Sequence, residues 1–427
     1  MHLHQESRTK FTPDNAVSAI VRVTMRTVVF VVPYPAETSI RFAKAFAELK
    51  AVRLIGLVQK PPTGAGAKPF ANFVRVDDAF DSKQIIEACE KVKKRYGGIH
   101  QIVGVLEPLQ VPLAEARQHF KIPGTDPKTA DLFRDKSRMK DALRAAGLPC
   151  ARHKLITSLA DAIHFVKDVG FPIVLKPPAG AGTKATWRIK NLEELQGVIQ
   201  AIHPSAQNPT LAEEFLKGRE YCFDTITVKG KVLFENITRY YPGPLEVIEN
   251  PWMQWACVQP AALTPDLDDA RELGRKAIKA LGLSTGFTHM EWFRRDDGSL
   301  AIGEIAARPP GANFVEMMGF GHDADMYRAW ARAIVDNAFD GPFKRQYAVG
   351  CAYLRGMGHG RVQRVTGVRE ANAKVGELAV KSKLPKLGQP KTDHYEGEGY
   401  VIVRHPDTEV VKQAVKTIIE TIRIEYA

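Results

Sequence analysis

The sequence predicts a globular, multidomain protein of mixed α/β and α+β class, for three reasons. Its 427 residues are enough for two to four packed units with substantial hydrophobic cores. Residues 27–106 alternate between short apolar runs and amphipathic helical patterns, which is typical of a parallel sheet flanked by helices. Residues 211–305 instead group several strand-like runs around one helical pattern at 268–281, which favours α+β structure.

The N-terminal alternation predicts a small parallel-sheet α/β domain at residues 25–123. Strands are expected at residues 27–32, 54–58, 73–76 and 102–106, and helices at residues 37–50 and 82–96. No GxGxxG turn follows the first strand. Because a dinucleotide-binding domain requires that turn, the sequence does not favour one here. The preceding residues 1–24 are polar and lack the apolar core of a secretory signal, so we expect a disordered N-terminal extension. An amphipathic transit peptide stays open, although Glu6 and Asp14 count against it.

Composition and charge limit the classes of function. With 44% hydrophobic and 25% charged residues, the chain is typical of globular proteins, and no apolar run approaches the roughly 20 residues of a membrane span. The five cysteines are scattered without CxxC spacing, so we expect a cytoplasmic protein without a disulfide framework or zinc site. The net charge of +12 fits an anionic substrate such as a nucleotide as well as nucleic acid. Because no nucleic-acid-reading motif occurs, nucleic-acid binding is not expected.

A strand that ends in a lysine is followed by a turn of small residues. The strand is expected at residues 171–176 and delivers Lys176 at its end. The turn contains Gly180, Gly182 and Thr183. The lysine would supply charge, and the small residues would let backbone N–H groups approach phosphate oxygens. A surface hairpin with a solvated lysine remains the alternative, because this is not a Walker sequence.

Residues 211–224 combine an apolar strand, a turn at Gly218 and a second strand that carries acids at intervals. The acids are Glu213, Glu214 and Glu220. Such a segment can offer backbone groups to an adenine edge and a carboxylate to ribose hydroxyls. An acidic rim on an ordinary hairpin explains the same pattern equally well.

The most informative stretch is a predicted β-hairpin between two strand-like runs. The Asp-Gly dipeptide at residues 297–298 predicts a two-residue turn. In that register Glu291 lies opposite Glu304, and facing residues share one side of the sheet. Phe293 and Ile302 then share this face, which favours a pocket over a solvated surface. Two facing carboxylates repel, and a divalent cation such as Mg²⁺, which takes oxygen ligands, would remove the conflict.

Further elements complete the prediction. Helices are expected at residues 135–147, 158–168 and 323–339, and a strand at residues 398–403. Trp252 and Trp255 lie in a β-rich stretch, where they either line a substrate pocket or pack in the core. Asp407 is a good N-cap for a terminal helix. Its buried stripe would be Val411, Val415, Ile418 and Ile422.

Taken in order, these motifs resemble those of the ATP-grasp superfamily, in its carboxylate–amine (L-amino acid) ligase-like branch. The motifs are Asp135-Lys136, Pro172 to Pro177, Glu213 to Glu220, Met290 to Phe293, and Gly303 to Gly311. The resemblance implies an ATP-grasp fold at residues 124–345, in which a small mobile subdomain at about 153–216 lies over the nucleotide. It also implies a C-terminal α+β lid at residues 346–427.

The resemblance further implies a role for each motif. Nucleotide binding is implied for Lys136, Lys176, Gly180, Gly182, Thr183, Glu213, Glu214, Leu216 and Glu220. The lysines would meet the phosphates, backbone groups of Glu214 and Leu216 would hold adenine, and Glu220 the ribose. Binding of Mg²⁺ (or Mn²⁺) is implied for Glu291 and Glu304, catalysis for Arg308, and substrate binding for Gly311 and Asn313. Arg308 would neutralise charge on the transferred phosphoryl group.

One position departs from the pattern of the family. Many members place an asparagine metal ligand where this chain has Ala306, which the hairpin register sets opposite His289. Either one metal is held less tightly, or another side chain such as Asn313 takes the place of the asparagine.

The expected function is an ATP-dependent carboxylate–amine ligase that forms an amide or peptide bond through an acyl phosphate, releasing ADP and phosphate. Its partners would be small-molecule carboxylate and amine substrates. The oligomeric state stays open, and a homodimer is one of the alternatives. A biotin carboxylase-like enzyme that uses carboxyphosphate is one alternative. In that branch a polar and acidic segment normally follows the arginine, whereas here residues 309–311 are Pro-Pro-Gly. The other alternative is a nucleotide-binding regulator that does not turn over ATP. Ala306 supports this alternative, and the retained lysines, glutamates and Arg308 argue against it.

Overall fold

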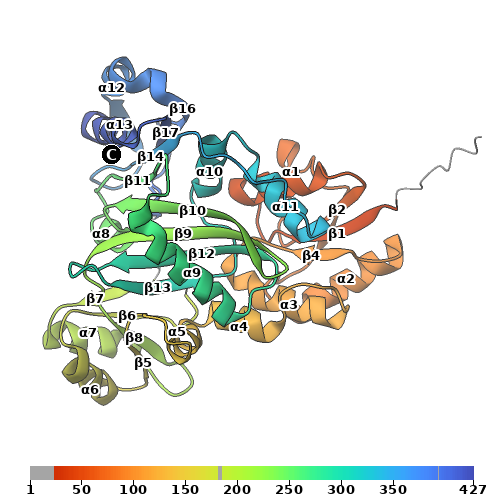
Figure 1. Ribbon diagram of the computed structural model, residues 1–427, viewed down its shortest axis with the longest axis horizontal. Coiled ribbons are helices and arrows are strands. Elements are labelled where there is room, and N and C mark those ends of the chain that lie inside the picture. Colours follow the sequence, from red (N-terminus) through yellow and green to blue (C-terminus); the bar gives the residue numbers. More distant parts are fainter. Residues whose placement is uncertain (1–23, 181–184, 393) are drawn as a thin grey trace, which may run out of the picture.

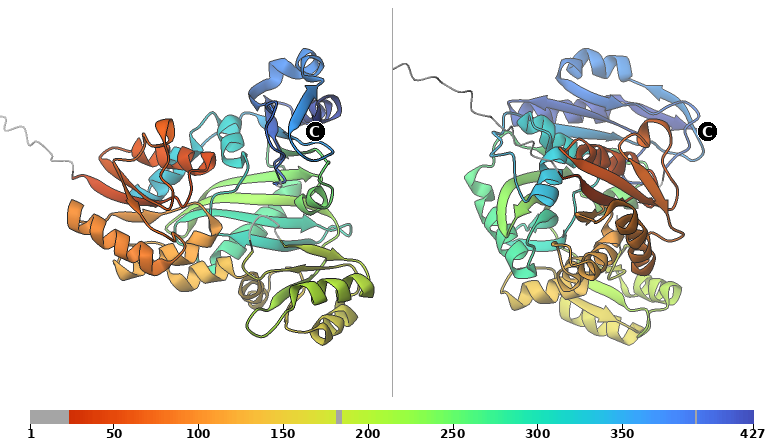
Figure 2. Two further views of the ribbon diagram at one scale, coloured as in Figure 1. Left: turned by 180° about the vertical axis from the view of Figure 1, so that it is seen from behind. Right: turned by 90° about the vertical axis from the view of Figure 1, so that its right-hand side faces the viewer.

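The computed structural model describes residues 24–180, 185–392 and 394–427, which form three lobes around one large sheet (Figure 1). The N-terminal lobe, in red and orange, lies on the right of this view, a small lobe lies at the lower left, and the blue C-terminal lobe lies at the upper left. The two further views show the same three lobes around the sheet (Figure 2). The expectations for residues 1–23 and for Gly182 and Thr183 fall outside the described residues.

The N-terminal lobe contains a four-stranded parallel sheet, as predicted. Its strands are β1 (Arg26–Val31), β2 (Val52–Val58), β3 (Asn72–Arg75) and β4 (Gln101–Val103), in the order β3-β2-β1-β4. Its helices are α1 (Glu37–Ala47), α2 (Ser82–Tyr96) and α3 (Gln110–His119), with short 3₁₀ turns η1 (Gly64–Gly66) and η2 (Glu107–Leu109). Residues 28–31 of β1 and 54–58 of β2 are apolar and buried because both faces of the sheet are covered there. The turn η2 places Glu107 just beyond the carboxyl end of β4.

The small lobe is a four-stranded sheet with helices on it, reached through α4 (Pro127–Arg134) and α5 (Lys136–Ala145). Its strands are β5 (His153–Ile156), β6 (Ile173–Lys176), β7 (Trp187–Ile189) and β8 (Thr210–Glu214), in the order β5-β8-β6-β7. Helices α6 (Leu159–Val169) and α7 (Leu192–Ile202) form a hydrophobic core with it. The Asp135 carboxylate accepts backbone N–H groups of Ser137 and Arg138, so α5 begins at Lys136.

The central sheet has eight strands and joins the middle of the chain to its C-terminal part. Its strands are β9 (Arg219–Val228), β10 (Lys231–Tyr241), β11 (Trp255–Gln259), β12 (Gly286–Arg294), β13 (Leu300–Ala306), β14 (Ala348–Leu354), β16 (Ala379–Lys383) and β17 (Gly399–His405). They follow the order β13-β12-β9-β10-β11-β14-β17-β16. The sheet therefore continues across residue 345, the position of the predicted domain boundary.

Helices cover both faces of this sheet. Helix α9 (Asp268–Leu281) buries its apolar stripe against one face, with Leu273 and Ala277 in the shared core. The other elements are α8 (Pro244–Glu249), η3 (Pro265–Leu267), α10 (Phe314–His322), α11 (Met326–Asp336), β15 (Val362–Thr366), α12 (Val368–Val375), η4 (Gly376–Leu378), α13 (Thr408–Thr421) and β18 (Arg423–Tyr426). The Asp407 cap is confirmed, since its carboxylate accepts the Glu409 N–H, and the predicted apolar stripe of α13 is buried. Among the described residues, no helix is long and apolar enough to span a membrane.

The carboxylate hairpin, β12 and β13, agrees with the predicted register in the middle and departs from it toward the turn. Arg294 pairs with Leu300, so residues 295–299 form the turn region and the predicted two-residue turn is wrong. A bulge at Gly303 then shifts the register by one residue, and Glu291 faces Glu304 as predicted. Ile302 lies opposite Trp292 in the core on the other face, so its predicted place beside Phe293 is wrong.

Candidate active site

A cavity of about 770 Å³ lies over one face of the central sheet, where the small lobe, the N-terminal lobe and the loop before α8 meet. This volume lies within the range of about 300–1,000 Å³ that is usual for small-molecule pockets. The predicted site residues that line it are Lys136, Lys176, Gly180, Glu213, Glu214, Leu216, Glu220, Glu291, Glu304, Arg308 and Gly311. The fold thus brings together segments that are far apart in the sequence.

The two hairpin carboxylates lie side by side on the cavity face. Glu291 and Glu304 are paired across β12 and β13, and both line the cavity. Lys136 Nζ lies 3.0 Å from Glu304 Oε1 and donates to the Gly180 carbonyl oxygen at 2.9 Å. Although burial opposes ionisation, Lys136 and Lys176 lower the pKa of Glu304 to about 2, so its carboxylate is ionised at neutral pH.

One buried glutamate at the base of the small lobe pairs with two lysines, of which Lys140 is buried and Lys176 is partly buried. Glu213 Oε1 lies 2.8 Å from Lys140 Nζ, and its Oε2 lies 2.9 Å from Lys176 Nζ. Lys140, which is fully buried, also donates to the Gly303 carbonyl oxygen at 2.6 Å, at the hairpin bulge. Although burial opposes the charged forms, the lysines lower the pKa of Glu213 to about 2, and the glutamates raise the pKa of Lys176. Glu213 therefore orients Lys176 and links the small lobe to the hairpin.

A carboxylate from the N-terminal lobe aligns three cations at the edge of the cavity. Glu107 is buried, and its Oε2 accepts Arg308 Nε–H at 3.0 Å. Its Oε1 lies 3.3 Å from Arg134 Nη1 and 3.8 Å from Lys136 Nζ. Arg134 in turn donates to the Gly180 carbonyl oxygen at 3.0 Å, so these contacts also fix the start of the turn that follows β6. Burial opposes the charge of Arg308, but the Glu107 and Glu304 carboxylates raise its pKa.

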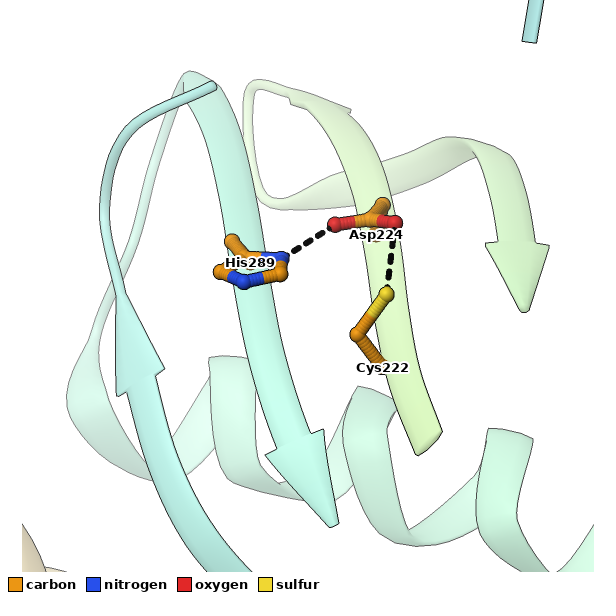
Figure 3. A group of neighbouring side chains, drawn as sticks. All are labelled: Cys222, Asp224 and His289. Atoms are coloured by element: carbon orange, nitrogen blue, oxygen red, sulfur yellow. Dashed lines mark hydrogen bonds and ion pairs between the residues drawn. The ribbon is translucent and has the colours of Figure 1, made fainter. Parts of the chain in front are cut away.

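A buried hydrogen-bonded chain supports the hairpin from β9 (Figure 3). His289 Nδ1 donates to Asp224 Oδ1 at 2.6 Å, and Cys222 Sγ donates to Asp224 Oδ2 at 3.2 Å. These three side chains are of types that bind metal ions. Two ligand atoms that each lie about 2.1 Å from one ion, at a right angle to one another, would be about 3 Å apart. The contact at 2.6 Å therefore marks a hydrogen bond that fixes the imidazole. It turns His289 Nε2 toward Glu291 Oε1, 3.7 Å away.

Glu220 lies on the same face, next to the loop before α8. Burial, with a smaller contribution from the charge of Glu291, raises the pKa of Glu220 well above its usual value. Its side chain rests against Gly243, where an added Cβ would lie 2.1 Å from Glu220 Oε2. A side chain at Gly243 would therefore displace the carboxyl group that we expected at the ribose.

The small lobe closes the other side of the cavity. Glu214 and Leu216 line it through the segment after β8, and the Arg188 guanidinium carbon lies 5.3 Å from the centre of the Phe215 ring. Arg188 on β7 also forms an ion pair with Glu249 of α8. This pair joins the small lobe to α8, the helix between β10 and β11 of the central sheet, and its Arg188 lines the cavity.

Some of the predicted site residues do not line the cavity, and some residues of the site were not predicted. Asn313 is buried with its Nδ2 4.0 Å from Cys351 Sγ, and it is not among the described residues that line the cavity. Trp255 packs fully in the core, whereas Trp252 is exposed. The residues of the site that were not predicted from the sequence are Glu107, Lys140, His289 as a pocket residue, Tyr240, Phe314 and Tyr395. A signal existed for Glu107, because residues just after the carboxyl ends of parallel strands often bind ligands.

Comparison with known proteins identifies the domain that forms the middle of the chain. Residues 141–319 match the family model of the ATP-grasp domain, so the chain contains an ATP-grasp domain and the predicted resemblance is confirmed. The L-amino acid ligase from Bacillus licheniformis superposes with a TM-score of 0.77 and 17% identity, over 95% of this chain and 99% of that one. An N5-carboxyaminoimidazole ribonucleotide synthetase from Thermotoga maritima gives 0.69 and 19%, over 94% of this chain and all of that one. At these identities the likeness shows the ATP-grasp fold.

Sequence relatives include ligases of amino acids. The chain is 27% identical over 252 residues to the L-arginine-specific L-amino acid ligase of Bacillus subtilis, which is 57% of this chain and 59% of that protein. It is also 27% identical over 255 residues to an alanine–anticapsin ligase of Bacillus subtilis, 55% of this chain and 53% of that protein. The chain thus spans between half and three-fifths of the length of these curated relatives.

Proposed function

We propose that this protein is an ATP-dependent carboxylate–amine ligase, which joins an acid to an amine as an amide or peptide. The observation that carries the proposal is the facing pair Glu291 and Glu304 in a cavity that also holds two lysines and Arg308. Carboxylates at this spacing suit Mg²⁺ or Mn²⁺, and cations around them suit a polyphosphate. The similarity to amino acid ligases supports the same class.

Each part of the cavity has a task in this proposal. Lys136 and Lys176 would bind the phosphates, the segment with Glu214 and Leu216 would hold adenine, and Glu220 the ribose. Glu291 and Glu304 would hold the divalent cation, which when bound supplies positive charge against the phosphate oxygens. Both carboxylates open onto the cavity, with side-chain exposures of 34% and 21%, so their oxygens are accessible to an ion there.

The reaction would take place in two steps. An oxygen of the substrate carboxylate attacks the γ-phosphorus of ATP, the bond to ADP breaks, and an acyl phosphate forms. The amine nitrogen then attacks the acyl carbon, phosphate leaves, and the nitrogen loses a proton. Arg308, fixed by Glu107, would neutralise the charge on the phosphoryl oxygens in both steps. Closure of the small lobe would keep water from the acyl phosphate.

A carboxylase that forms carboxyphosphate from bicarbonate is the second candidate. Structural similarity favours keeping it, because N5-carboxyaminoimidazole ribonucleotide synthetases and a biotin carboxylase domain share this fold. The Pro-Pro-Gly segment after Arg308 argues for the ligase instead. A regulator that does not turn over ATP is disfavoured by the facing carboxylates Glu291 and Glu304 and by the cations around them.

The test is ADP release from the full-length protein with ATP, Mg²⁺ and a panel of amino acids and other carboxylates, each with mixed amines. The ligase predicts ADP release that needs both an acid and an amine, with an amide product by mass spectrometry. ADP release that depends on bicarbonate selects the carboxylase. ATP binding without turnover under every condition selects the regulator.

Glu107→Gln is expected to lower kcat for ADP release by about 10- to 100-fold, because Arg308 loses its charged anchor and misplacement by an ångström costs rates of this order. The KM for ATP should change less, since Lys136 keeps its closer carboxylate, Glu304, at 3.0 Å, and Lys176 and the adenine segment are not touched. Steady-state kinetics on Glu107→Gln and Glu115→Gln provide the measurement and its control, Glu115 being an exposed residue of α3 in the same lobe. An unchanged kcat would show that Arg308 is positioned without Glu107.

Arg188→Ala is expected to weaken ATP binding by about 5- to 10-fold, mainly through faster release, because it removes a cation from the cavity lining and the ion pair that joins the small lobe to α8. Stopped-flow release of a fluorescent ATP analogue would measure this rate. Glu193→Ala, on an exposed position of α7 in the same lobe, is the matched control and should release the analogue at the wild-type rate. Equal release rates for Arg188→Ala and wild type would contradict the assigned role.

A further inference from the structure

The cavity face of the central sheet divides into an ionic half and an aromatic half. On β13 and β12 this face carries Glu304 and Glu291. Residue alternation places Tyr240 of β10 and Trp255 of β11 on the same face, and Trp255 pairs with Tyr353 of β14. The change from carboxylates to rings takes place near β10, and the cavity extends over both halves.

Three rings from different parts of the chain line the aromatic half. Tyr240 comes from β10, Phe314 from the start of α10, and Tyr395 from the loop before β17, and all three line the cavity. The ring centres of Tyr240 and Phe314 are 5.8 Å apart. We call these three residues the aromatic wall.

A second layer holds the wall in place. The buried Trp255 stacks on Tyr353 with ring centres 4.1 Å apart, and its ring lies 6.1 Å from Tyr240 and 5.4 Å from Tyr395. Trp255 Nε1 donates to the Tyr395 carbonyl oxygen at 2.6 Å, which ties the C-terminal loop to the sheet. The wall is therefore supported on its far side, so a ligand meets a surface that is already formed.

The wall directly adjoins the reacting end of the cavity. The rings of Phe314 and His289 have centres 6.2 Å apart. A Cβ built on Gly311, three residues after Arg308, would lie 3.8 Å from the Tyr395 hydroxyl oxygen. An acid whose carboxylate lies among Glu291, Glu304 and Arg308 would thus have its side chain beside the wall.

We propose that the acid which this cavity activates carries a large apolar side chain, best an aromatic one, that packs against Tyr240, Phe314 and Tyr395. The physical reason is that burying an apolar side chain on a preformed apolar surface is favourable, and ring pairs add to this through offset or edge contacts. A charged side chain there would lose its water without gaining an ionic partner from the wall. The proposal rests on the proposed ligase function and deepens it by naming the class of acid.

The test uses hydroxylamine as the nucleophile, because it traps an activated acid as a hydroxamate whatever the natural amine is. Full-length protein is given ATP, Mg²⁺ and one acid at a time: phenylalanine, tryptophan, leucine, alanine, serine, aspartate or arginine. We expect kcat/KM for phenylalanine or tryptophan to exceed that for alanine, serine and aspartate by at least about 10-fold.

Two substitutions at Tyr395 separate the ring from its hydroxyl. Tyr395→Ala removes the ring and is expected to raise KM for the aromatic acids by about 10-fold, with a smaller change for alanine, so that the preference shrinks. Tyr395→Phe retains the ring and should retain the preference. Because Tyr395 is only partly buried, both variants should fold, and their melting temperatures will check this.

The outcomes separate this inference from the proposed function. Better turnover of small or charged acids, or an unchanged preference in Tyr395→Ala, overturns the aromatic wall as a side-chain site and leaves the ligase standing. No hydroxamate and no ADP from any acid counts against the ligase. In that case calorimetry with phenylalanine and serine, in the presence of a non-hydrolysable ATP analogue, decides the inference, which fails unless phenylalanine binds at least about 10-fold more tightly.

Discussion

Glu304→Gln should abolish ATP-dependent ADP release, with a loss of at least about 100-fold, because it removes a charged ligand from the proposed divalent-cation site. The wild-type carboxylate is well suited to this role, since its pKa of about 2 keeps it ionised at neutral pH. The substitution also leaves Lys136 without its closest carboxylate, 3.0 Å away. Binding of Mn²⁺ in the presence of an ATP analogue, followed by electron paramagnetic resonance, should weaken in parallel.

The control for this variant lies in the same hairpin. Asp296→Asn removes a carboxylate from the exposed turn and should leave ADP release and Mn²⁺ binding at the wild-type level. Circular dichroism should show both variants folded, because Lys136 keeps the Gly180 carbonyl oxygen as a partner. ADP release by Glu304→Gln at more than a tenth of the wild-type rate would remove Glu304 from the proposed machinery.

Glu213→Gln is expected to destabilise the protein by about 3–5 kcal/mol, because removing one partner of a buried ion pair leaves an uncompensated charge. Here one carboxylate serves Lys140 and Lys176, at 2.8 Å and 2.9 Å. Urea denaturation measures the change. Glu272→Gln, which breaks an exposed pair with Lys276 at 2.7 Å, is the matched control and should leave the free energy of unfolding close to that of the wild type.

The difference between wild type and Glu213→Gln should depend on pH in a stated direction. The pKa of the Glu213 carboxyl group is lowered from its usual value of 4.5 to about 2 in the folded protein. A carboxyl group with a depressed pKa stabilises the folded protein at pH values above its pKa in the unfolded chain. This contribution is lost as the pH falls through its pKa in the folded protein. The difference in free energy of unfolding should therefore be constant above about pH 5.5 and decline toward pH 2. A difference that grows on acidification would contradict the assignment.

Local pattern predicted much of the fold. The N-terminal strands, helix α2 and helix α9 lie where periodicity placed them, and the parallel sheet is confirmed. The sequence did not reveal α10, whose apolar residues are spread around the helix because it is buried on most sides. Glu291 faces Glu304 as predicted, although the predicted turn is wrong. The reason is that the bulge at Gly303 compensates for the one-residue difference in register.

By itself the sequence determined where the candidate side chains lie along their strands and which way they face, because alternation along a strand and the residues of a turn are local properties. It placed Glu291 and Glu304 on one face and Lys176 at the end of β6. Only the tertiary structure decided their partners. Glu107 meets Arg308 across 201 residues, and Lys140 meets Gly303 across 163. A buried charge must be paired, but periodicity encodes only the direction of a side chain, and the pairing follows from how the lobes pack.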